Sequence, residues 1–285
     1  DYVLFFTDKG RVYRLKCYEV PEGSRQSKGM NIANLLPIAS DEKVTSMIRV
    51  PEFDEEKYLV MVTKQGIIKR ISLNAYNTAR KGGLIALELN EGDELAWVRL
   101  TDGNQQVIVA TKNGLAIRFE ETDVRPMGRQ ARGVKAISLR EGDCVVGMCV
   151  VANDDLILTA SETGFGRISN VSDYRLQSRG GKGITNYHTE KYGNVAAVSA
   201  VKLDEDIIII SQEGVIIRIA ADTVRICNRP SKGVTLMRIG ENDKVVTVAR
   251  APHEDSESEK TEETAEEETS EENTAPETNA EENTE

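Results

Sequence analysis

The sequence has few of the residues from which metal and catalytic sites are most often built. It has only two histidines, His188 and His253, and its four cysteines form no C-x-x-C pair, which argues against a zinc site. P-loop, G-x-S-x-G and H-E-x-x-H motifs are also missing. We therefore expect a chain that holds no metal and no cofactor and that has no catalytic residue of its own.

Long apolar runs are missing as well. The sequence contains no stretch of eighteen apolar residues and no signal peptide, so it predicts no contact with a membrane. Unpaired cysteine spacings fit a reduced, cytoplasmic setting. The chain starts at Asp1, inside a strand-like run, and we expect it to be a monomeric piece of a longer protein.

Negative charge is concentrated at one end of the chain. Residues 252–285 carry fifteen acidic side chains against the single Lys260, and they include no aromatic or β-branched aliphatic residue. A segment with so little to bury is predicted to be a disordered acidic tail. The tail contributes −14 to a net charge of −11, which leaves +3 on residues 1–251. This body is mildly basic, so the placement of its cations must carry any argument for nucleic-acid binding.

A β-type run followed by a polar turn that ends in glycine occurs five times in the body. Apolar runs flank each turn, as in residues 107–110 and 115–119, which is the pattern of a β-hairpin with glycine at a positive φ. The turn glycines are Gly10, Gly66, Gly114, Gly164 and Gly214, at steps of 56, 48, 50 and 50 residues. Repeats of this length without helical periodicity predict an all-β, propeller-like array.

We expect residues 1–251 to form five blades of about four strands each. The predicted bounds of the blades are residues 1–51, 52–104, 105–152, 153–203 and 204–251. The abrupt start also favours at least one further blade upstream.

Positive charge gathers in a loop that follows each turn glycine at a nearly constant distance. Four of these loops read R-x-x-K/R-G, and the second repeat departs from this pattern. The basic residues of the five loops are Arg25, Lys28, Arg80, Lys81, Arg129, Arg132, Arg179, Lys182, Arg229 and Lys232. Equivalent positions of radial blades share a rim, so these residues are predicted to form a curved track for the phosphates of duplex DNA, which glycine and serine let the backbone approach. Solvation alone would explain one basic turn, whereas five in register favour a binding role.

Another cation lies three or four residues after each turn glycine. These residues are Arg14, Arg70, Arg118, Arg167 and Arg218. We expect them to be secondary DNA contacts on a strand face. A solvated face or ion pairs to a neighbouring blade would explain them equally well.

Several segments, together with the acidic tail, resemble the C-terminal β-pinwheel of the DNA gyrase A protein in order as well as in type. The segments are Gly10-Arg11-Val12-Tyr13, Asn34-Leu35-Leu36-Pro37 and Val124-Arg125-Pro126-Met127-Gly128. The resemblance covers residues 1 to about 251. It implies hairpin-invaded blades whose rim wraps duplex DNA and supports negative supercoiling, with the rest of the gyrase A protein and the gyrase B protein as partners. It also implies that the nucleophilic tyrosine and the ATP site of this topoisomerase lie outside the chain.

The diagnostic box of that family, Q-R-R-G-G-K-G, has a close copy in the fourth repeat. The copy differs only at Ser178 and consists of Gln177, Ser178, Arg179, Gly180, Gly181, Lys182 and Gly183. In the family the box lies in the first of six blades, and Asp1 resembles the start of the second. We therefore interpret this copy as a relic of the repeat, with the true box upstream, and expect the chain to bind DNA better than it wraps it.

Two other functions fit part of the pattern. The C-terminal domain of the topoisomerase IV A protein is a related domain that selects the transported duplex and usually has a degenerate box. A propeller that recognises proteins would pair its cations with acidic side chains, but aromatic residues make up only 5% of the chain and the G-H and W-D pairs of that repeat are missing. The Gly-basic motif in successive repeats and the acidic tail favour gyrase.

Overall fold

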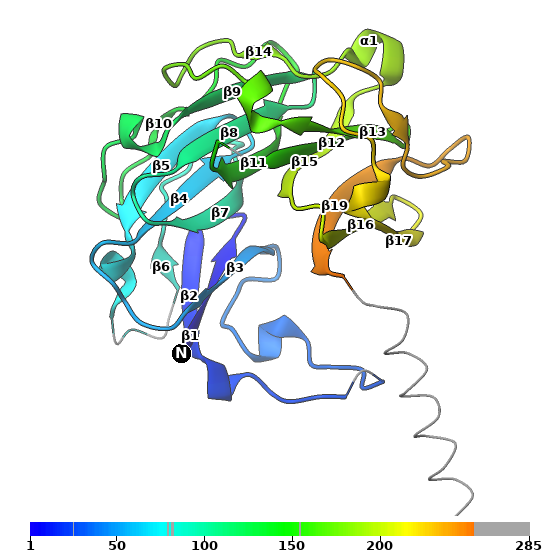
Figure 1. The fold of residues 1–285 in the computed structure, drawn as a ribbon. Helices are drawn as coiled ribbons and strands as arrows, with labels where there is room; N and C mark the ends of the chain where they lie inside the picture. Colours follow the sequence, from blue (N-terminus) through cyan, green and yellow to red (C-terminus); the bar gives the residue numbers. More distant parts are fainter. Residues whose placement is uncertain (25, 79, 81–82, 154, 254–285) are drawn as a thin grey trace, which may run out of the picture.

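The computed structural model describes residues 1–24, 26–78, 80, 83–153 and 155–253. These residues form nineteen strands in five antiparallel sheets, which follow one another around an arc (Figure 1). The prediction of an all-β array of five blades is confirmed. The acidic segment 254–285 lies outside the described residues, and so does the prediction that it is disordered.

The sheets share one plan, with a hairpin in the middle, a long strand on the inner side and, in the first four, a two-residue strand on the outer side. The first sheet has the order β3-β1-β2-β6 and consists of β1 (Tyr2–Thr7), β2 (Arg11–Lys16), β3 (Val44–Val50) and β6 (Leu84–Ile85). The second has the order β10-β5-β4-β7 and consists of β4 (Tyr58–Thr63), β5 (Ile67–Ser72), β7 (Leu95–Thr101) and β10 (Val134–Lys135).

The third and fourth sheets repeat this plan. The third has the order β11-β8-β9-β14 and consists of β8 (Gln106–Thr111), β9 (Leu115–Glu120), β11 (Val145–Val151) and β14 (Ile184–Thr185). The fourth has the order β15-β12-β13-β18 and consists of β12 (Leu156–Ser161), β13 (Phe165–Asn170), β15 (Val195–Val201) and β18 (Val234–Thr235). The fifth has the order β17-β16-β19 and consists of β16 (Glu205–Ser211), β17 (Ile216–Ala220) and β19 (Val245–Pro252).

The two-residue strand of each complete sheet is supplied by the following repeat. Leu84 pairs with Val12, and Val234 pairs with Gly166, across the boundary between repeats. A repeat of the sequence is therefore not the same unit as a sheet of the fold. Within the described part of the chain nothing supplies such a strand to β17, so the fifth sheet has three strands.

Short helical turns connect the sheets. A 3-10 turn follows the second hairpin strand of each repeat, at η1 (Cys17–Glu19), η3 (Leu73–Tyr76), η4 (Glu121–Asp123), η5 (Val171–Asp173) and η6 (Ala221–Thr223). The remaining turns are η2 (Ile32–Asn34) and the four-residue helix α1 (Thr189–Tyr192). Among the described residues no helix is long and apolar enough to span a bilayer.

The turn glycines have the positive φ that the hairpin pattern predicts, and the carbonyl groups of the first four also bind the backbone of the next repeat. Gly164 has φ +82°, and its carbonyl accepts hydrogen bonds from the backbone N–H groups of Leu236 and Met237 at 2.8 and 3.1 Å. A Cβ on Gly164 would lie 2.1 Å from the carbonyl oxygen of Met237. Glycine is required here because two backbones meet at the turn.

The hydrophobic core lies between neighbouring sheets. Leu4 and Phe6 of β1 pack with Leu59 and Met61 of β4, and all four side chains are completely buried. Similar clusters join the second sheet to the third, the third to the fourth and the fourth to the fifth. Because both faces of the inner sheets are covered, their strands read as nearly continuous apolar runs.

Candidate nucleic-acid interface

The basic loops of the second to fifth repeats lie at the outer edges of the sheets because each leads into a two-residue edge strand, as residues 229–233 lead into β18. The first loop, at residues 25–29, leads into no such strand among the described residues. The loop glycine is explained by that pairing. Gly133 and Gly233 have φ of +90° and +82°, and a Cβ would lie 2.6 Å from the oxygen of Ile68 and 1.9 Å from that of Gly166. Contact with the preceding hairpin therefore requires glycine here, whether or not a phosphate binds.

The second basic residue of each described loop is exposed. These residues are Lys28, Arg132, Lys182 and Lys232. Arg132 forms an ion pair with Glu88 at 2.7 Å, and since both side chains are about half exposed, the pair contributes little to stability. The ammonium of Lys232 lies 3.5 Å from the ring centre of Phe165. The four charges remain available at the surface.

The second repeat supplies Arg80, which is exposed, whereas Arg25 and Lys81 lie outside the described residues. Arg129 is half-buried. The buried Lys69 binds the backbone of this loop, because its Nζ donates to the carbonyl oxygens of Arg129 and Ala131 at 2.6 and 3.2 Å.

The first arginine of the loop has a different environment in the fourth and fifth repeats. Arg179 donates from Nε to the oxygen of Asp123 at 3.0 Å and from Nη1 to that of Lys135 at 3.2 Å. Arg229 lies with its guanidinium 4.9 Å from the ring centre of Tyr174. Burial lowers the pKa of Arg229. Both arginines are half-buried and bind backbone carbonyl groups of the protein.

Three of the expected secondary contacts are inside the protein, which corrects that expectation. Arg167 is completely buried and donates from Nη2 to the backbone and side-chain oxygens of Asn186 at 2.5 and 3.2 Å. Arg118 is 6% exposed and donates to the oxygens of Val171 and Tyr174. Arg70 is 7% exposed. These guanidinium groups are bound to polar atoms of the protein and leave little surface for a phosphate.

The other two members of that set lie at the ends of the arc. Arg14 is half-buried and stacks with its guanidinium 4.8 Å from the ring centre of Tyr2. Arg218 forms an ion pair with Asp206 at 2.6 Å and is 35% exposed. Each has a partner within its own sheet, so among the described residues neither forms the ion pair to a neighbouring blade that the sequence left open.

The box-like residues 177–183 are held mainly against the protein. The backbone N–H of Gln177 donates to the oxygen of Arg118 at 2.8 Å, and that of Gly180 donates to the oxygen of Ala136 at 2.6 Å. The hydroxyl of Ser138 donates to the oxygen of Gly180 at 2.8 Å. Of the residues in this segment, Ser178 and Lys182 are the exposed ones.

A second row of cations was not predicted from the sequence. Arg125, Arg175 and Arg225 recur at a spacing of 50 residues, and all three are exposed. Each precedes a residue that makes an isolated bridge to the neighbouring hairpin, such as Leu176 to Arg118. The sequence does contain this pattern, because each of these arginines lies four residues before the first arginine of the basic loop in its repeat.

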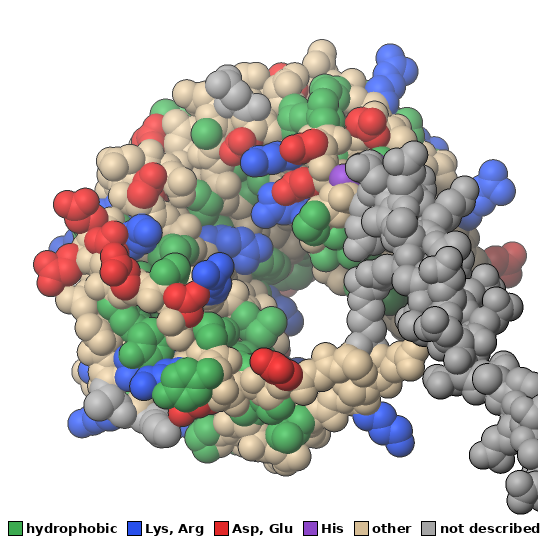
Figure 2. Space-filling model, turned by 60° about the horizontal axis from the view of Figure 1, so that its bottom comes forward, with side chains coloured by type: hydrophobic (Ala, Val, Ile, Leu, Met, Phe, Trp, Pro, Cys, Tyr) green, Lys and Arg blue, Asp and Glu red, His purple; other side chains and the backbone are tan. Residues whose placement is uncertain are grey.

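Two clefts between neighbouring loops are lined by cations. One of about 610 Å³ is lined by Arg11, Arg80 and Arg129, and one of about 890 Å³ by Lys191, Arg225, Arg229 and Lys232. Neither includes an Asp or Glu among its described lining residues. Low-dielectric walls and charge of one sign raise the local concentration of anions. Figure 2 shows basic side chains projecting at several places around the outline of the molecule.

A family model described as the DNA gyrase C-terminal domain, a β-propeller, matches residues 1–51, 57–102, 105–151, 155–202 and 205–252. The chain belongs to this family. The five matched segments correspond to the five repeats and span nearly all of the described residues.

Individual relatives agree with this family. The chain is 54% identical over 133 residues to the DNA gyrase A protein of Clostridium acetobutylicum and 56% identical over 133 residues to that of Halalkalibacterium halodurans. Each match covers 47% of this chain and only 16% of the relative.

Solved structures of the family share the fold. The C-terminal domain of a DNA topoisomerase IV superposes with a TM-score of 0.83 at 27% identity, covering 94% of this chain and 84% of that one. A DNA gyrase A C-terminal domain superposes with a TM-score of 0.76 at 27% identity, covering 88% and 82%. The fold of this chain is thus shared with C-terminal domains of both kinds of topoisomerase.

Proposed function

We propose that this chain binds duplex DNA along the outer edge of its arc and, as part of a DNA gyrase, helps to wrap the duplex for negative supercoiling. The observation that carries the proposal is the pair of clefts lined by cations without carboxylates, one at each of two loop junctions. Because the loops repeat every 50 residues or so, the charges follow the curve of the sheets.

The chemistry of this edge favours phosphate contacts over base recognition. Lysine and arginine side chains at loop tips bind phosphate oxygens, which carry no sequence information. The α-helix of the described residues, α1, has four residues, so this part of the chain offers no long recognition helix to read bases in the major groove. Binding is therefore expected to show little sequence preference.

The chain has a structural rather than a chemical role in this proposal. Within the described residues no group of three or more potential metal ligands is found. DNA cleavage and ATP hydrolysis would belong to the rest of the gyrase A protein and to the gyrase B protein, its partners in a cytoplasmic gyrase. A bound duplex that follows the arc would be bent, and the contacts along the edge would offset the cost of bending.

A role in topoisomerase IV is the second candidate, because the superposition on such a domain extends over 94% of the chain. The higher identity to gyrase A proteins, 54% and 56% over 133 residues, favours gyrase. The two differ in wrapping. Relaxation of plasmid in the presence of the chain as part of a gyrase holoenzyme should leave topoisomers of shifted linking number under the gyrase proposal and an unshifted distribution under the alternative.

The salt dependence of duplex binding tests the proposal directly. If roughly six to ten phosphates are neutralised, log K should fall against log[salt] with a slope of about −5 to −9. Fluorescence anisotropy with two duplexes of unrelated sequence measures the slope and the sequence preference together. An affinity that does not depend on salt, or a strong preference for one duplex, would contradict phosphate binding and favour a protein-recognition role.

A further inference from the structure

The two loop arginines of the fourth and fifth repeats make the same contacts fifty residues apart. Arg229 donates from Nε to the oxygen of Asp173 at 2.9 Å and from Nη1 to that of Thr185 at 2.5 Å. Arg179 makes the same two bonds to Asp123 and Lys135. A contact that recurs at the same atoms in two repeats is a feature of the fold rather than a chance surface conformation.

These carbonyl groups belong to different sheets. Asp173 ends η5, directly after β13 of the fourth sheet, whereas Thr185 ends β14, the edge strand of the third. Arg229 therefore joins the outer edges of two adjacent sheets. Its bonds are charge-assisted, and a planar fork fits two carbonyl groups in a way that a lysine ammonium cannot reproduce.

The arginines four residues earlier are different. Arg175 and Arg225 are exposed, and no hydrogen bond or ion pair involves their side chains within the part of the chain that the structure describes. Their neighbours Leu176 and Ile226 make backbone bridges to Arg118 and Ile168. The backbone at these arginines is thus fixed on the neighbouring hairpin while the guanidinium groups face solvent.

We propose that Arg179 and Arg229 are positioning residues that join neighbouring sheets at the outer edge, and that Arg175 and Arg225 are the arginines that contact phosphate. The second half rests on the proposed function of duplex binding. The joining arginines fix the angle between sheets and hence the curvature along which Arg175 and Arg225 are presented.

The cleft of about 890 Å³ contains both kinds of residue side by side. Arg229 forms part of its wall through the bonds to Asp173 and Thr185, while Arg225, Lys191 and Lys232 supply exposed charge. A phosphate that enters the cleft would meet three exposed cations, whereas the guanidinium of Arg229 is already bound to backbone carbonyl groups of the protein.

Substitutions of the two arginines in the complete 285-residue chain separate these roles. Arg225→Gln removes an exposed charge, so the salt slope of duplex binding should become less negative by about 0.9, affinity should fall roughly eightfold at about 0.1 M salt, and the melting temperature should stay within about 1 °C. Arg229→Lys keeps the charge and loses the fork, so the melting temperature should fall by about 3 °C or more with little change in slope. Arg175→Gln and Arg179→Lys form the matched second pair.

The reverse pattern would overturn the proposal: an unchanged slope in Arg225→Gln, or an unchanged melting temperature in Arg229→Lys. Failure of Arg229→Lys to fold would support the joining role, and Arg179→Lys then provides the melting comparison. If the unsubstituted chain bound no duplex, the proposed function would fail together with the phosphate role of Arg225. The melting temperatures would still decide the role of Arg229.

Discussion

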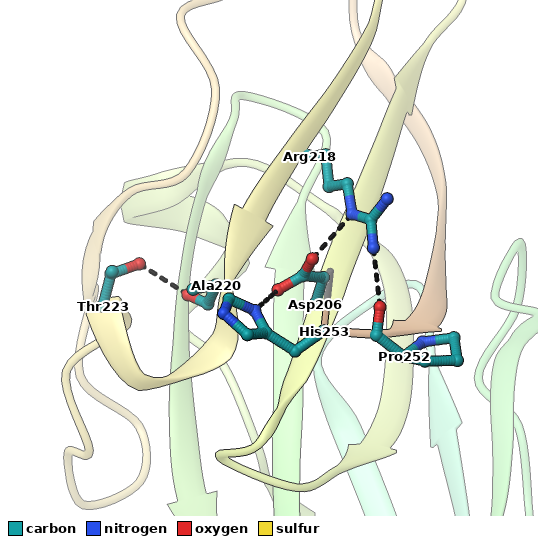
Figure 3. A network of polar contacts seen from close by, with 6 residues as sticks. All are labelled: Asp206, Arg218, Ala220, Thr223, Pro252 and His253. Carbon is teal, nitrogen blue, oxygen red and sulfur yellow. Dashed lines mark hydrogen bonds and ion pairs between the residues drawn. The ribbon is translucent and has the colours of Figure 1, made fainter. Parts of the chain in front are cut away.

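Asp206 joins the last strand of the fold to the hairpin beside it (Figure 3). Its carboxylate accepts a hydrogen bond from Nε of Arg218 at 2.6 Å and lies 2.7 Å from Nδ1 of His253. Arg218 also donates from Nη2 to the oxygen of Pro252 at 2.6 Å. These contacts hold the end of β19 beside β16 and β17, in the sheet that lacks a fourth strand among the described residues.

This network predicts that the carboxylate of Asp206 makes a contribution to the free energy of unfolding that depends on pH. The hydrogen bond with His253 and the bond and charge of Arg218 lower the pKa of Asp206 in the folded state. A carboxylate with a lowered pKa stabilises the fold above its unfolded pKa of about 3.9, and this contribution is lost as the pH falls through the folded value. Asp206→Asn should therefore melt at a lower temperature than the unsubstituted chain at pH 6, and the difference should shrink below about pH 4.

Calorimetric scans of the two chains between pH 3 and pH 7 measure this difference. Asp204→Asn is the control, because Asp204 is exposed and its side chain makes no hydrogen bond or ion pair with the described residues, so its melting curve should follow that of the unsubstituted chain. A difference for Asp206→Asn that stayed constant down to pH 3 would show that the carboxylate does not titrate as described.

The arginines of the secondary set show which part of the site the sequence could not reveal. Arg118 and Arg218 occupy equivalent positions, yet Arg118 is 6% exposed and the side chain of Arg218 is 35% exposed. Alternation along a strand predicts which face a side chain lies on. It does not predict whether another sheet covers that face, which depends on contacts between residues more than 50 positions apart, as between Arg118 and Val171 or Tyr174.

At the scale of the element, the hairpins were predictable and the borrowed strands were not. Polar turns ending in glycine between apolar runs predict the hairpins around Gly114 and Gly164, because only glycine tolerates the positive φ there. Strands β14 and β18 have two residues each, which is too short for any periodicity. They exist because they pair with the second hairpin strand of the preceding repeat, whose turn carbonyl binds the two residues that follow each of them.

Alanine substitutions at the turn glycines separate conformational strain from the contact with the next repeat. Gly164 and Gly214 have φ of +82° and +85°, so alanine at either position costs about 1–2 kcal/mol. A Cβ at Gly164 would also lie 2.1 Å from the oxygen of Met237, whereas one at Gly214 would have no described atom within 4 Å. Gly164→Ala should therefore destabilise the chain by about 2 kcal/mol more than Gly214→Ala.

Urea unfolding of both variants measures the comparison, with Gly214→Ala as the matched control for strain alone. Equal losses of unfolding free energy would mean that the incoming segment around Met237 contributes nothing beyond the turn itself. A larger loss in Gly164→Ala would identify the strand exchange as a source of stability between blades.

At the scale of the whole molecule, the same contacts between neighbouring repeats recur from sheet to sheet, so the outer edges of the sheets follow one another along the arc. A shared core and a borrowed strand connect each sheet to the next, so the loops leading into β10, β14 and β18 lie at equivalent outer edges of successive sheets. Figure 2 shows basic and acidic side chains mixed on the visible face. Because the net charge of residues 1–251 is only +3, DNA binding would depend on where the cations lie rather than on how many there are.

The same charge balance predicts that residues 254–285 weaken duplex binding. They carry fifteen acidic side chains and one lysine, and thirty-two residues can span at most roughly 110 Å, enough to reach the cations of several loops. Tethering keeps their effective concentration high, so they compete with DNA. Deleting them should tighten binding most at low salt, with the gain shrinking as salt screens both partners. A variant in which glutamine replaces every glutamate of the segment keeps the length and should bind like the deletion. If the glutamine variant bound like the unsubstituted chain, excluded volume rather than charge would be responsible, and equal low-salt affinities of all three chains would leave the segment a solubilising appendage.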